Sequence, residues 1–242
     1  MTSWDFPATD PIDLHLDIPA GNITVTALAA GTATVTVVPC AEGRRGEEFL
    51  AATRVGFDHG VLSVTAPDRR GLHRGASLDV TVEVPSGSAA ELVTASADVR
   101  CSGELRSLVV RTASGDVAAG RVTGPVQVHT ASGDVRLSDV GELRAETASG
   151  DVQVGTAAGD VSVRTASGEV RIGAVAAGRT DITSASGDVS VDVPAGIGVY
   201  LDLSTLSGSA TSDLQATAGD HDTAVTLRCR TISGDVRVGR AA

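Results

Sequence analysis

Aromatic residues are scarce in this sequence, and their scarcity limits both the fold and the chemistry it can support. Phenylalanine, tyrosine and tryptophan make up 2% of the 242 residues, and hydrophobic residues of all kinds make up 42%. A core built from small and β-branched side chains suits narrow coils of strand. Clefts that cleave sugars usually present aromatic platforms beside paired carboxylates, so a carbohydrate-active enzyme is only the third functional hypothesis.

The sequence is also short of cysteine, of positive charge and of long apolar runs. Its three cysteines are odd in number and lack metal-ligand spacing, which predicts neither a disulfide framework nor a zinc site. The net charge of −11 argues against a nucleic-acid partner. The first ten residues lack the basic and apolar regions of a signal peptide, and no apolar run is long enough to span a membrane. We therefore expect a cytoplasmic protein without an integral membrane segment.

One short phrase, Thr-Ala-Ser-Gly-Asp-Val, recurs through most of the chain. Close copies begin at Thr112, Thr130 and Thr147. Looser copies begin at Thr94, Thr165, Ser184, Thr205 and Thr231. The interval is about 18 residues, and repetition with a period of this size is typical of solenoids.

Apolar residues occupy fixed positions around each copy of the phrase. In the copy that begins at Thr165, they are Val161 and Val163 before it and Val170 and Ile172 after it, with polar residues between them. Because side chains alternate across a strand, these columns predict two inward walls. Each coil would then have two short strands and two corners, one of them the Ser-Gly-Asp turn. The other corner is looser, as in Gly141-Glu142-Leu143.

The first 89 residues are less regular. They contain alternating strand-like segments and two excursions, Pro39 to Glu48 and Pro67 to Gly75. The second excursion holds the densest positive charge in the chain, and it is either a solvated loop or a contact for an acidic partner. A Val-x-Val-Pro-x-Gly type of corner appears at residues 16–21, 82–87 and 191–196 and predicts strand-ending turns.

These patterns predict an all-β fold. We expect a single-stranded parallel β-helix, or β-solenoid, with an N-terminal layer of alternating strands. The whole chain, residues 1–242, would be one elongated domain, irregular over 1–89 and regular over 90–242. Solenoid ends expose strand edges, and the expected caps are the first ten residues and residues 237–242.

The repeated phrase and the three proline corners resemble the bacterial putative-adhesin family of unknown function, also described as toastrack-like. The resemblance extends from about Ile12 to Val238. It implies that the Ser-Gly-Asp-Val copies mark coils of a single-stranded β-helix, and it supplies no catalytic residue. The adhesin label implies a surface role, whereas this sequence shows no secretion signal.

A column of carboxylates follows the repeat turns, and it is the main candidate site. The turn residues are Gly115, Asp116, Gly133, Asp134, Gly150, Asp151, Gly187, Asp188, Gly234 and Asp235. We expect each aspartate to accept backbone N–H groups at its own turn. The alternative is a ladder of calcium sites, for which the candidate ligands are Asp116, Asp134, Asp151, Asp220 and Asp222. Eight equivalent turn serines without a paired histidine predict no nucleophile.

The function predicted from these features is that of a non-catalytic β-solenoid, an adhesin-like interaction or scaffold protein. We expect no cofactor and no catalytic residue, and we expect a protein partner. Self-association through the ends or faces of the solenoid is a further expectation. The alternative function is a calcium- or ligand-binding adhesin-like module that uses the Asp column.

Overall fold

The structure is a computed structural model, and it describes residues 1–29, 31–40, 43–67, 76–214 and 223–241. It forms two compact units, Met1–Thr123 (unit 1) and Gly124–Ala242 (unit 2), which are described separately. The fold class predicted from the sequence is confirmed, because the chain is all-β apart from one short helix and most of its strands pair in parallel. The prediction of a single elongated domain stays a prediction.

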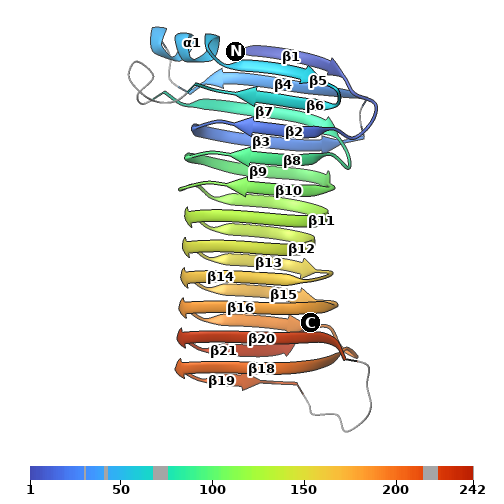
Figure 1. The fold of residues 1–242 in the computed structure, drawn as a ribbon, viewed down its shortest axis with the longest axis vertical. Coiled ribbons are helices and arrows are strands. Elements are labelled where there is room, and N and C mark those ends of the chain that lie inside the picture. Colours follow the sequence, from blue (N-terminus) through green and yellow to red (C-terminus); the bar gives the residue numbers. More distant parts are fainter. Residues whose placement is uncertain (30, 41–42, 68–75, 215–222, 242) are drawn as a thin grey trace. The chain divides into compact units, whose positions relative to one another are not determined.

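Unit 1 contains the helix and the first half of the strands (Figure 1). Its elements are β1 (Thr2–Pro7), β2 (Asp13–Asp17), β3 (Ala20–Leu28), β4 (Thr32–Pro39), α1 (Arg44–Ala51), β5 (Arg54–Asp58), β6 (Val61–Thr65), β7 (Leu78–Pro85), β8 (Ala89–Val93), β9 (Ser96–Leu105), β10 (Ser107–Arg111) and residues 117–123 of β11 (Val117–Ser132).

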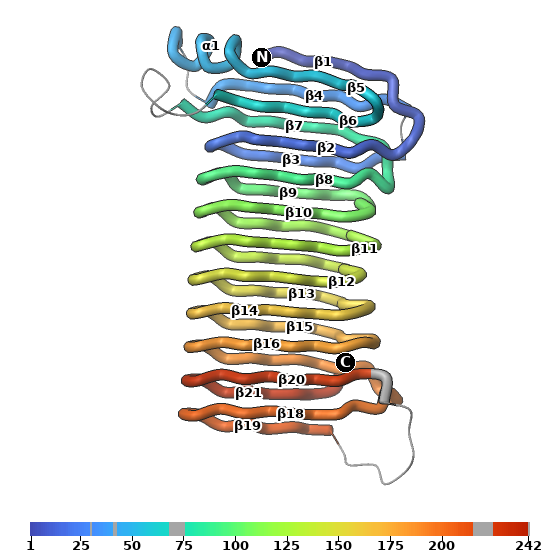
Figure 2. Tube along the Cα trace, in the orientation of Figure 1, coloured from blue at the N-terminus to red at the C-terminus, as the bar shows by residue number. Residues whose placement is uncertain are grey.

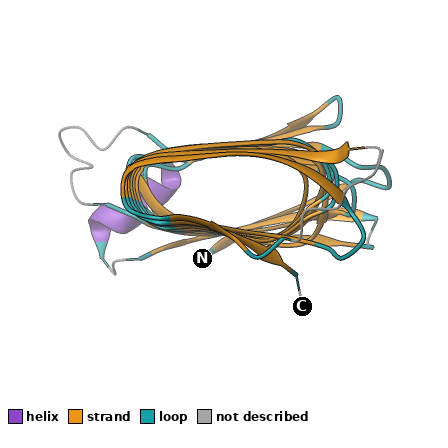
Figure 3. Cartoon of the chain, turned by 90° about the horizontal axis from the view of Figure 1, so that it is seen from below, coloured by secondary structure: helices purple, strands orange, loops and turns teal. Residues whose placement is uncertain are grey.

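Unit 2 contains the remaining strands. They are the rest of β11, then β12 (Val135–Ser149), β13 (Val152–Ala157), β14 (Val161–Ser167), β15 (Val170–Val175), β16 (Gly178–Ser186), β17 (Val189–Val193), β18 (Gly198–Ser207), β19 (Ala210–Ser212), β20 (Thr223–Ser233) and β21 (Val236–Arg240). The strands lie in two facing layers (Figure 3). We call them sheet A (124–132, 143–149, β14, β16, β20, β18) and sheet B (135–140, β13, β15, β17, β21, β19).

The inward columns predicted from the repeat are confirmed by the strand register of unit 2. In sheet B, Val152 pairs with Val170, Val170 with Val189, and Val189 with Val236, all in parallel. Each of these four valines is at most 1% exposed. The interior is therefore a stack of equivalent apolar side chains, which removes apolar surface from water at every coil.

The order of the coils in space differs from their order in the chain. We expected the last two strands to close the stack, but β20 lies between β16 and β18, and β21 lies between β17 and β19 (Figure 2). The coil of β18 and β19 is therefore the terminal coil of unit 2. Residues 237–242 were predicted to form a cap, and that prediction is wrong, because β21 is paired on both sides.

In unit 1, too, the order of strands in space differs from their order in the chain, and antiparallel strands are added near the N-terminus. β2 lies between β6 and β8, and β3 lies between β7 and β9, all in parallel. Beyond them β4 pairs antiparallel with β7, β1 with β4, and β5 with β6. These antiparallel strands lie within the less regular N-terminal layer that we expected over residues 1–89.

A short helix replaces part of the first predicted excursion from the sheet. α1 packs against β4, and its Phe49 is fully buried. Arg44 and Glu48 form an i,i+4 ion pair on its exposed side. The first ten residues, which we expected to form a cap, contribute the strand β1, and β1 pairs with β4. The second excursion, with Arg69, Arg70, His73 and Arg74, lies outside the described residues.

Glycine is required at the repeat turns because the coils stack closely there. Gly150 has a φ of 134°. A Cβ atom added to Gly150 would lie 2.2 Å from the carbonyl oxygen of Gly133 in the neighbouring coil. The backbone conformation and the contact both exclude other residues at this position, which explains why every copy after the one at Thr94, which has Ala97, keeps its glycine.

Candidate functional site

Ionic side chains form a connected network on the outer surface of sheet A in unit 2, which we call face A. Glu146 is its centre, with one carboxylate oxygen 2.7 Å from a guanidinium nitrogen of Arg144 and 3.6 Å from one of Arg164. Its other oxygen lies 3.2 Å from Nδ1 of His129. Side chains from three neighbouring strand segments therefore meet at one carboxylate, because their outward positions are in register.

A second network continues face A towards the terminal coil. The Arg179 guanidinium donates to Asp181 at 2.6 Å. Asp202 of β18 accepts from Arg228 at 2.9 Å and from Arg230 at 3.3 Å, both on β20. Arginine and acidic side chains thus alternate across β16, β20 and β18, and each strand is tied to its neighbour by a charged pair.

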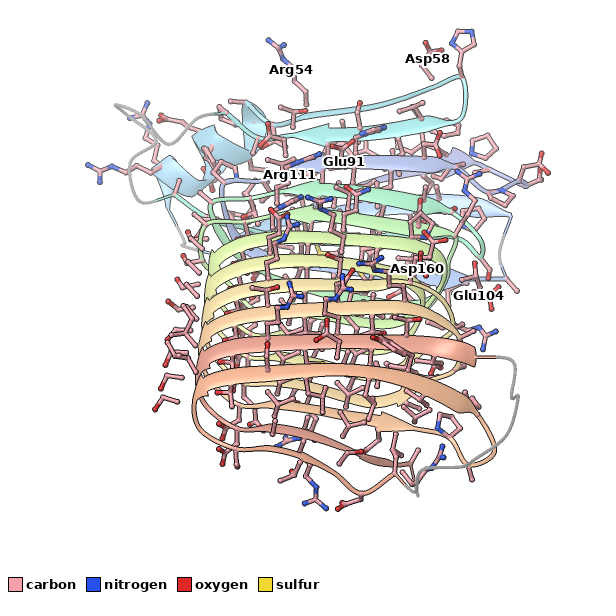
Figure 4. The ribbon with its side chains drawn as sticks, turned by 60° about the horizontal axis from the view of Figure 1, so that its bottom comes forward. Arg54, Asp58, Glu91, Glu104, Arg111 and Asp160 are labelled. Carbon is pink, nitrogen blue, oxygen red and sulfur yellow. The ribbon has the colours of Figure 1, made fainter. Side chains whose placement is uncertain are left out.

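Unit 1 has a smaller arrangement of the same kind. The carboxylate of Glu91 on β8 faces the guanidinium of Arg111 on β10, as Figure 4 shows. The other oxygen of Glu91 lies 3.3 Å from Nδ1 of His15 on β2. His15, Glu91 and Arg111 therefore form one network of charged and polar side chains on the outer surface of unit 1.

A surface groove with a volume of about 310 Å³ lies along face A at the second corner of the coils. Its lining combines buried apolar residues with exposed polar ones from four successive coils. The lining residues are Pro125, Val126, Gln127, Glu142, Leu143, Arg144, Asp160, Val161, Ser162, Arg179 and Asp181. Asp160, labelled in Figure 4, accepts the backbone N–H of Arg179 at 2.8 Å and so fixes the corner between two coils.

The charged groups of face A stabilise one another's ionised forms. The hydrogen bond from Arg144 lowers the pKa of Glu146, with smaller contributions from His129 and Arg164. The hydrogen bond that Arg179 donates to Asp181 raises the pKa of Arg179. At neutral pH the groove therefore offers fixed positive and negative groups that can pair with charges and exchange hydrogen bonds with a ligand.

The sequence predicted polar residues on the outer faces of the strands and a second corner in each coil, but it did not predict that they line a groove. The signal in the sequence that could have revealed the groove is a regular spacing of four residues at the second corner. The intervals are 17, 18 and 19 residues, close to the repeat period, and the residues are Pro125, Glu142, Asp160 and Arg179. That regularity places one outward side chain per coil at the same rim. Only the register shows that they line one hollow.

The Asp column has a different hydrogen-bond arrangement from the one we expected. Asp134 accepts the N–H of Asp151 at 3.0 Å, Asp151 that of Glu169 at 2.8 Å, and Asp188 that of Asp235 at 2.8 Å. In unit 1, Asp98 accepts the N–H of Asp116 at 3.1 Å. Each of these four carboxylates thus accepts the N–H of the equivalent residue in the neighbouring coil, whereas we expected bonds within a single turn.

These bonds offset the repulsion between stacked carboxylates. Arg136 lies 2.6 Å from Asp134, and Arg100 lies 3.8 Å from Asp98. Asp235 accepts both the N–H and the hydroxyl of Ser209, and these hydrogen bonds lower the pKa of its carboxyl. The column therefore joins successive coils through charge-assisted hydrogen bonds.

The predicted calcium ligands are placed only in part. Asp116, Asp134 and Asp151 take part in the cross-coil bonds just described, whereas Asp220 and Asp222 lie outside the described residues. Among the residues that the structure describes, no group of three or more histidine, cysteine, aspartate or glutamate side chains could hold a metal ion. No helix of the described chain is long and apolar enough to cross a membrane.

The comparison with protein families decides which family the chain belongs to. The model described as Toastrack DUF4097 matches residues 14–239. The chain belongs to the toastrack family. Among solved structures, this toastrack chain is similar to a putative adhesin from Bacteroides fragilis, with a TM-score of 0.60 and 11% identity over 98% of this chain and 96% of that one.

A second similar structure is a putative lipid binding protein from Parabacteroides distasonis. Its TM-score is 0.48 at 12% identity, over 100% of this toastrack chain and 94% of that one. Comparison with curated proteins finds no match. The likeness to the Bacteroides fragilis structure, at 11% identity, shows the fold alone.

Proposed function

We propose that this toastrack protein is a non-catalytic, adhesin-like interaction module that binds a polypeptide of mixed charge along face A of unit 2. The observation that carries the proposal is the charge network around Glu146, which fixes cations and anions in alternating rows beside the groove. The similar structure from Bacteroides fragilis is described as a putative adhesin, which supports a binding role.

The chemistry of face A favours a protein partner over the other classes of ligand. Nucleic acids and anionic membranes bind surfaces that are positively charged throughout, whereas positive and negative side chains alternate on face A. Its side chains are already held in ion pairs, so they lose less conformational entropy when a partner binds. A chain with both acidic and basic side chains is complementary to such rows.

Peptide selection tests this proposal. Random dodecapeptides displayed on phage are selected on the immobilised protein, and their affinities are measured against two variants. Arg164→Glu alters face A, where Arg164 is 64% exposed and makes only a 3.6 Å contact. Arg171→Glu is the matched control, because Arg171 is a similarly exposed arginine on β15 of sheet B.

We expect selected peptides of mixed charge to lose at least about tenfold in affinity for Arg164→Glu and to bind Arg171→Glu as they bind the parent. Selection that yields no binding peptide, or peptides equally sensitive to both variants, would contradict the proposal. The cytoplasmic location expected from the sequence is a separate proposal, tested by fractionating cells of the natural source.

A further inference from the structure

The terminal coil of unit 2 leaves strand edges unpaired among the described residues. Within the described part of the chain, β18 hydrogen-bonds only to β20 and β19 only to β21, whereas β20 and β21 are paired on both sides. Figure 2 shows β18 and β19 as the last coil of the unit. An unpaired strand edge is a template for pairing with another chain.

The inward columns are also incompletely covered at this coil. Val236 on β21 is fully buried, but Ala210, its partner on β19, is exposed. On β18 the inward residues Leu201 and Leu203 are only half-buried, although their partners Leu227 and Cys229 on β20 are fully buried. Apolar side chains of the core therefore reach the surface beside the free edges.

The edge of β18 carries little that would oppose pairing. Charged side chains and proline commonly protect edge strands. β18 contains no proline, and its one charged residue, Asp202, is already neutralised by Arg228 and Arg230. The edge strands of unit 1 differ, because β1 carries Asp5 and Pro7 and β5 carries charges at Arg54 and Asp58.

We propose that two copies of this chain associate through the terminal coil, with β18 antiparallel to the partner's β18 about a two-fold axis at Leu203. A two-fold contact uses the same surface on both copies, so β18 must be complementary to itself. Opposite residues of antiparallel strands share a face, so inward residues must meet inward ones. The axis can then lie at Leu201, Asp202, Leu203 or Ser204, the residues nearest the middle of β18. An axis at Ser204 is unfavourable because it sets Asp202 opposite the partner's Leu206.

Charge and exposure select among these registers. An axis at Asp202 sets two carboxylates opposite each other, which is unfavourable. An axis at Leu201 leaves Leu206, which is 84% exposed, without a partner. An axis at Leu203 sets Tyr200, 59% exposed, opposite the partner's Leu206 and Asp202 opposite the partner's Ser204. This register covers the two most exposed large apolar side chains of the coil.

The size of the contact sets the affinity we expect. One pair of strands and the rim of one core bury less than the roughly 800 Å² per partner of a standard interface. We therefore expect a dissociation constant in the micromolar range. This proposal does not depend on face A, so it stands or fails separately from the proposed function.

Sedimentation and light scattering of the full chain from about 1 to 300 μM test the association. The expected mass rises with concentration from 24.3 kDa towards twice that value. Leu206→Lys should weaken the dimer at least tenfold. Ile232→Lys is the matched control, because Ile232 holds the equivalent position on β20, is 57% exposed and is not on the terminal coil. A monomer at every concentration, or equal effects of the two variants, would overturn the proposal.

Disulfide trapping tests the register. In a Cys40→Ser background, which removes the exposed thiol, Leu203→Cys should form an intermolecular disulfide under mild oxidation. Leu201→Cys is the control, because in the proposed register it faces the partner's Thr205 and lies about four residues from the partner's own cysteine. Equal trapping of both variants, or trapping at position 201 alone, would overturn the axis at Leu203. Thermal unfolding of each variant confirms that it is folded.

Discussion

The Oδ1 atom of Asp151 accepts the N–H of Glu169 at 2.8 Å, and the two residues hold the same position in consecutive coils of unit 2. Asp151 donates its own N–H to Asp134 at 3.0 Å. The aspartate of each repeat therefore links its coil to the next, and the most regular residue of the phrase acts between repeats rather than within one.

Removing one carboxylate should weaken this link. We expect Asp151→Ala to lower the free energy of unfolding by about 1 to 2 kcal/mol, because the N–H of Glu169 loses its acceptor. Asp151→Asn keeps an oxygen acceptor at this position and should lose less than half as much. Chemical denaturation of the three proteins measures the difference. Equal losses in both variants would show that charge, rather than the hydrogen bond, is what the position supplies.

Calcium should leave the stability of the described column unchanged. The Oδ1 atoms of Asp134 and Asp151 already accept N–H groups and the other oxygen of Asp134 is paired with Arg136, so an ion would compete with bonds that are already made. We expect the same melting temperature in millimolar calcium and in chelator. A rise of several degrees with calcium would show that the native state binds the ion, since a ligand of the folded form alone stabilises it.

The order of the coils predicts different costs for two substitutions in one column. Val236→Asp should destabilise unit 2 by more than about 3 kcal/mol, because it buries an unpaired carboxylate between two coils. Ala210→Asp should cost less than about 1 kcal/mol, since Ala210 lies on the exposed terminal coil. Thermal unfolding of dilute samples distinguishes them. A larger loss for Ala210→Asp than for Val236→Asp would show that β20 and β21 form the terminal coil instead.

Thr180 is expected to yield a stabilised protein when it is made apolar. Its side chain is fully buried on β16, and its hydroxyl has no hydrogen-bond partner among the described residues. Thr180→Val keeps the shape and removes the unsatisfied group, which should raise the melting temperature by about 2–4 °C. The reverse change at the paired position, Val161→Thr, serves as control and should lower it.

The three thiols should differ sharply in reactivity. Burial raises the pKa of Cys101 to about 12 and that of Cys229 to about 12, so neither forms thiolate near neutral pH. Cys40 is exposed, and desolvation raises its pKa by a smaller amount. A disulfide reagent at about pH 8 should titrate one thiol slowly in the native protein and three in denaturant. Three rapid reactions without denaturant would contradict the buried columns.

Much of the interior could be predicted from the repeat alone, because a column needs only alternation and a constant period. Val163 and Val170 were expected inside and are fully buried. The coil order could not be predicted in the same way. Thr205 and Thr231 begin equivalent phrases, so β18 and β20 present the same pattern to β16, and alternation does not decide which one stacks there.

Other features depend on contacts that alternation does not encode. The cross-coil bond of Asp151 requires the register between coils, so turn chemistry alone suggested a local bond. The helix α1 is short, and its segment contains Gly46; the pairing of Arg44 with Glu48 is its one clear helical sign. The groove of face A also needs the register, since its charged rim comes from four coils.

The insertion of β21 between β17 and β19 affects how unit 2 responds to tension. A strand at the end of a stack can be peeled away, breaking its bonds one after another. β21 is held by β17 on one side and β19 on the other, with Val193 opposite Arg240. A pull on the chain beyond Arg240 must slide β21 past both neighbours and break many bonds at once. We therefore expect β21 to resist a pull along its own axis better than the terminal strand β19 does.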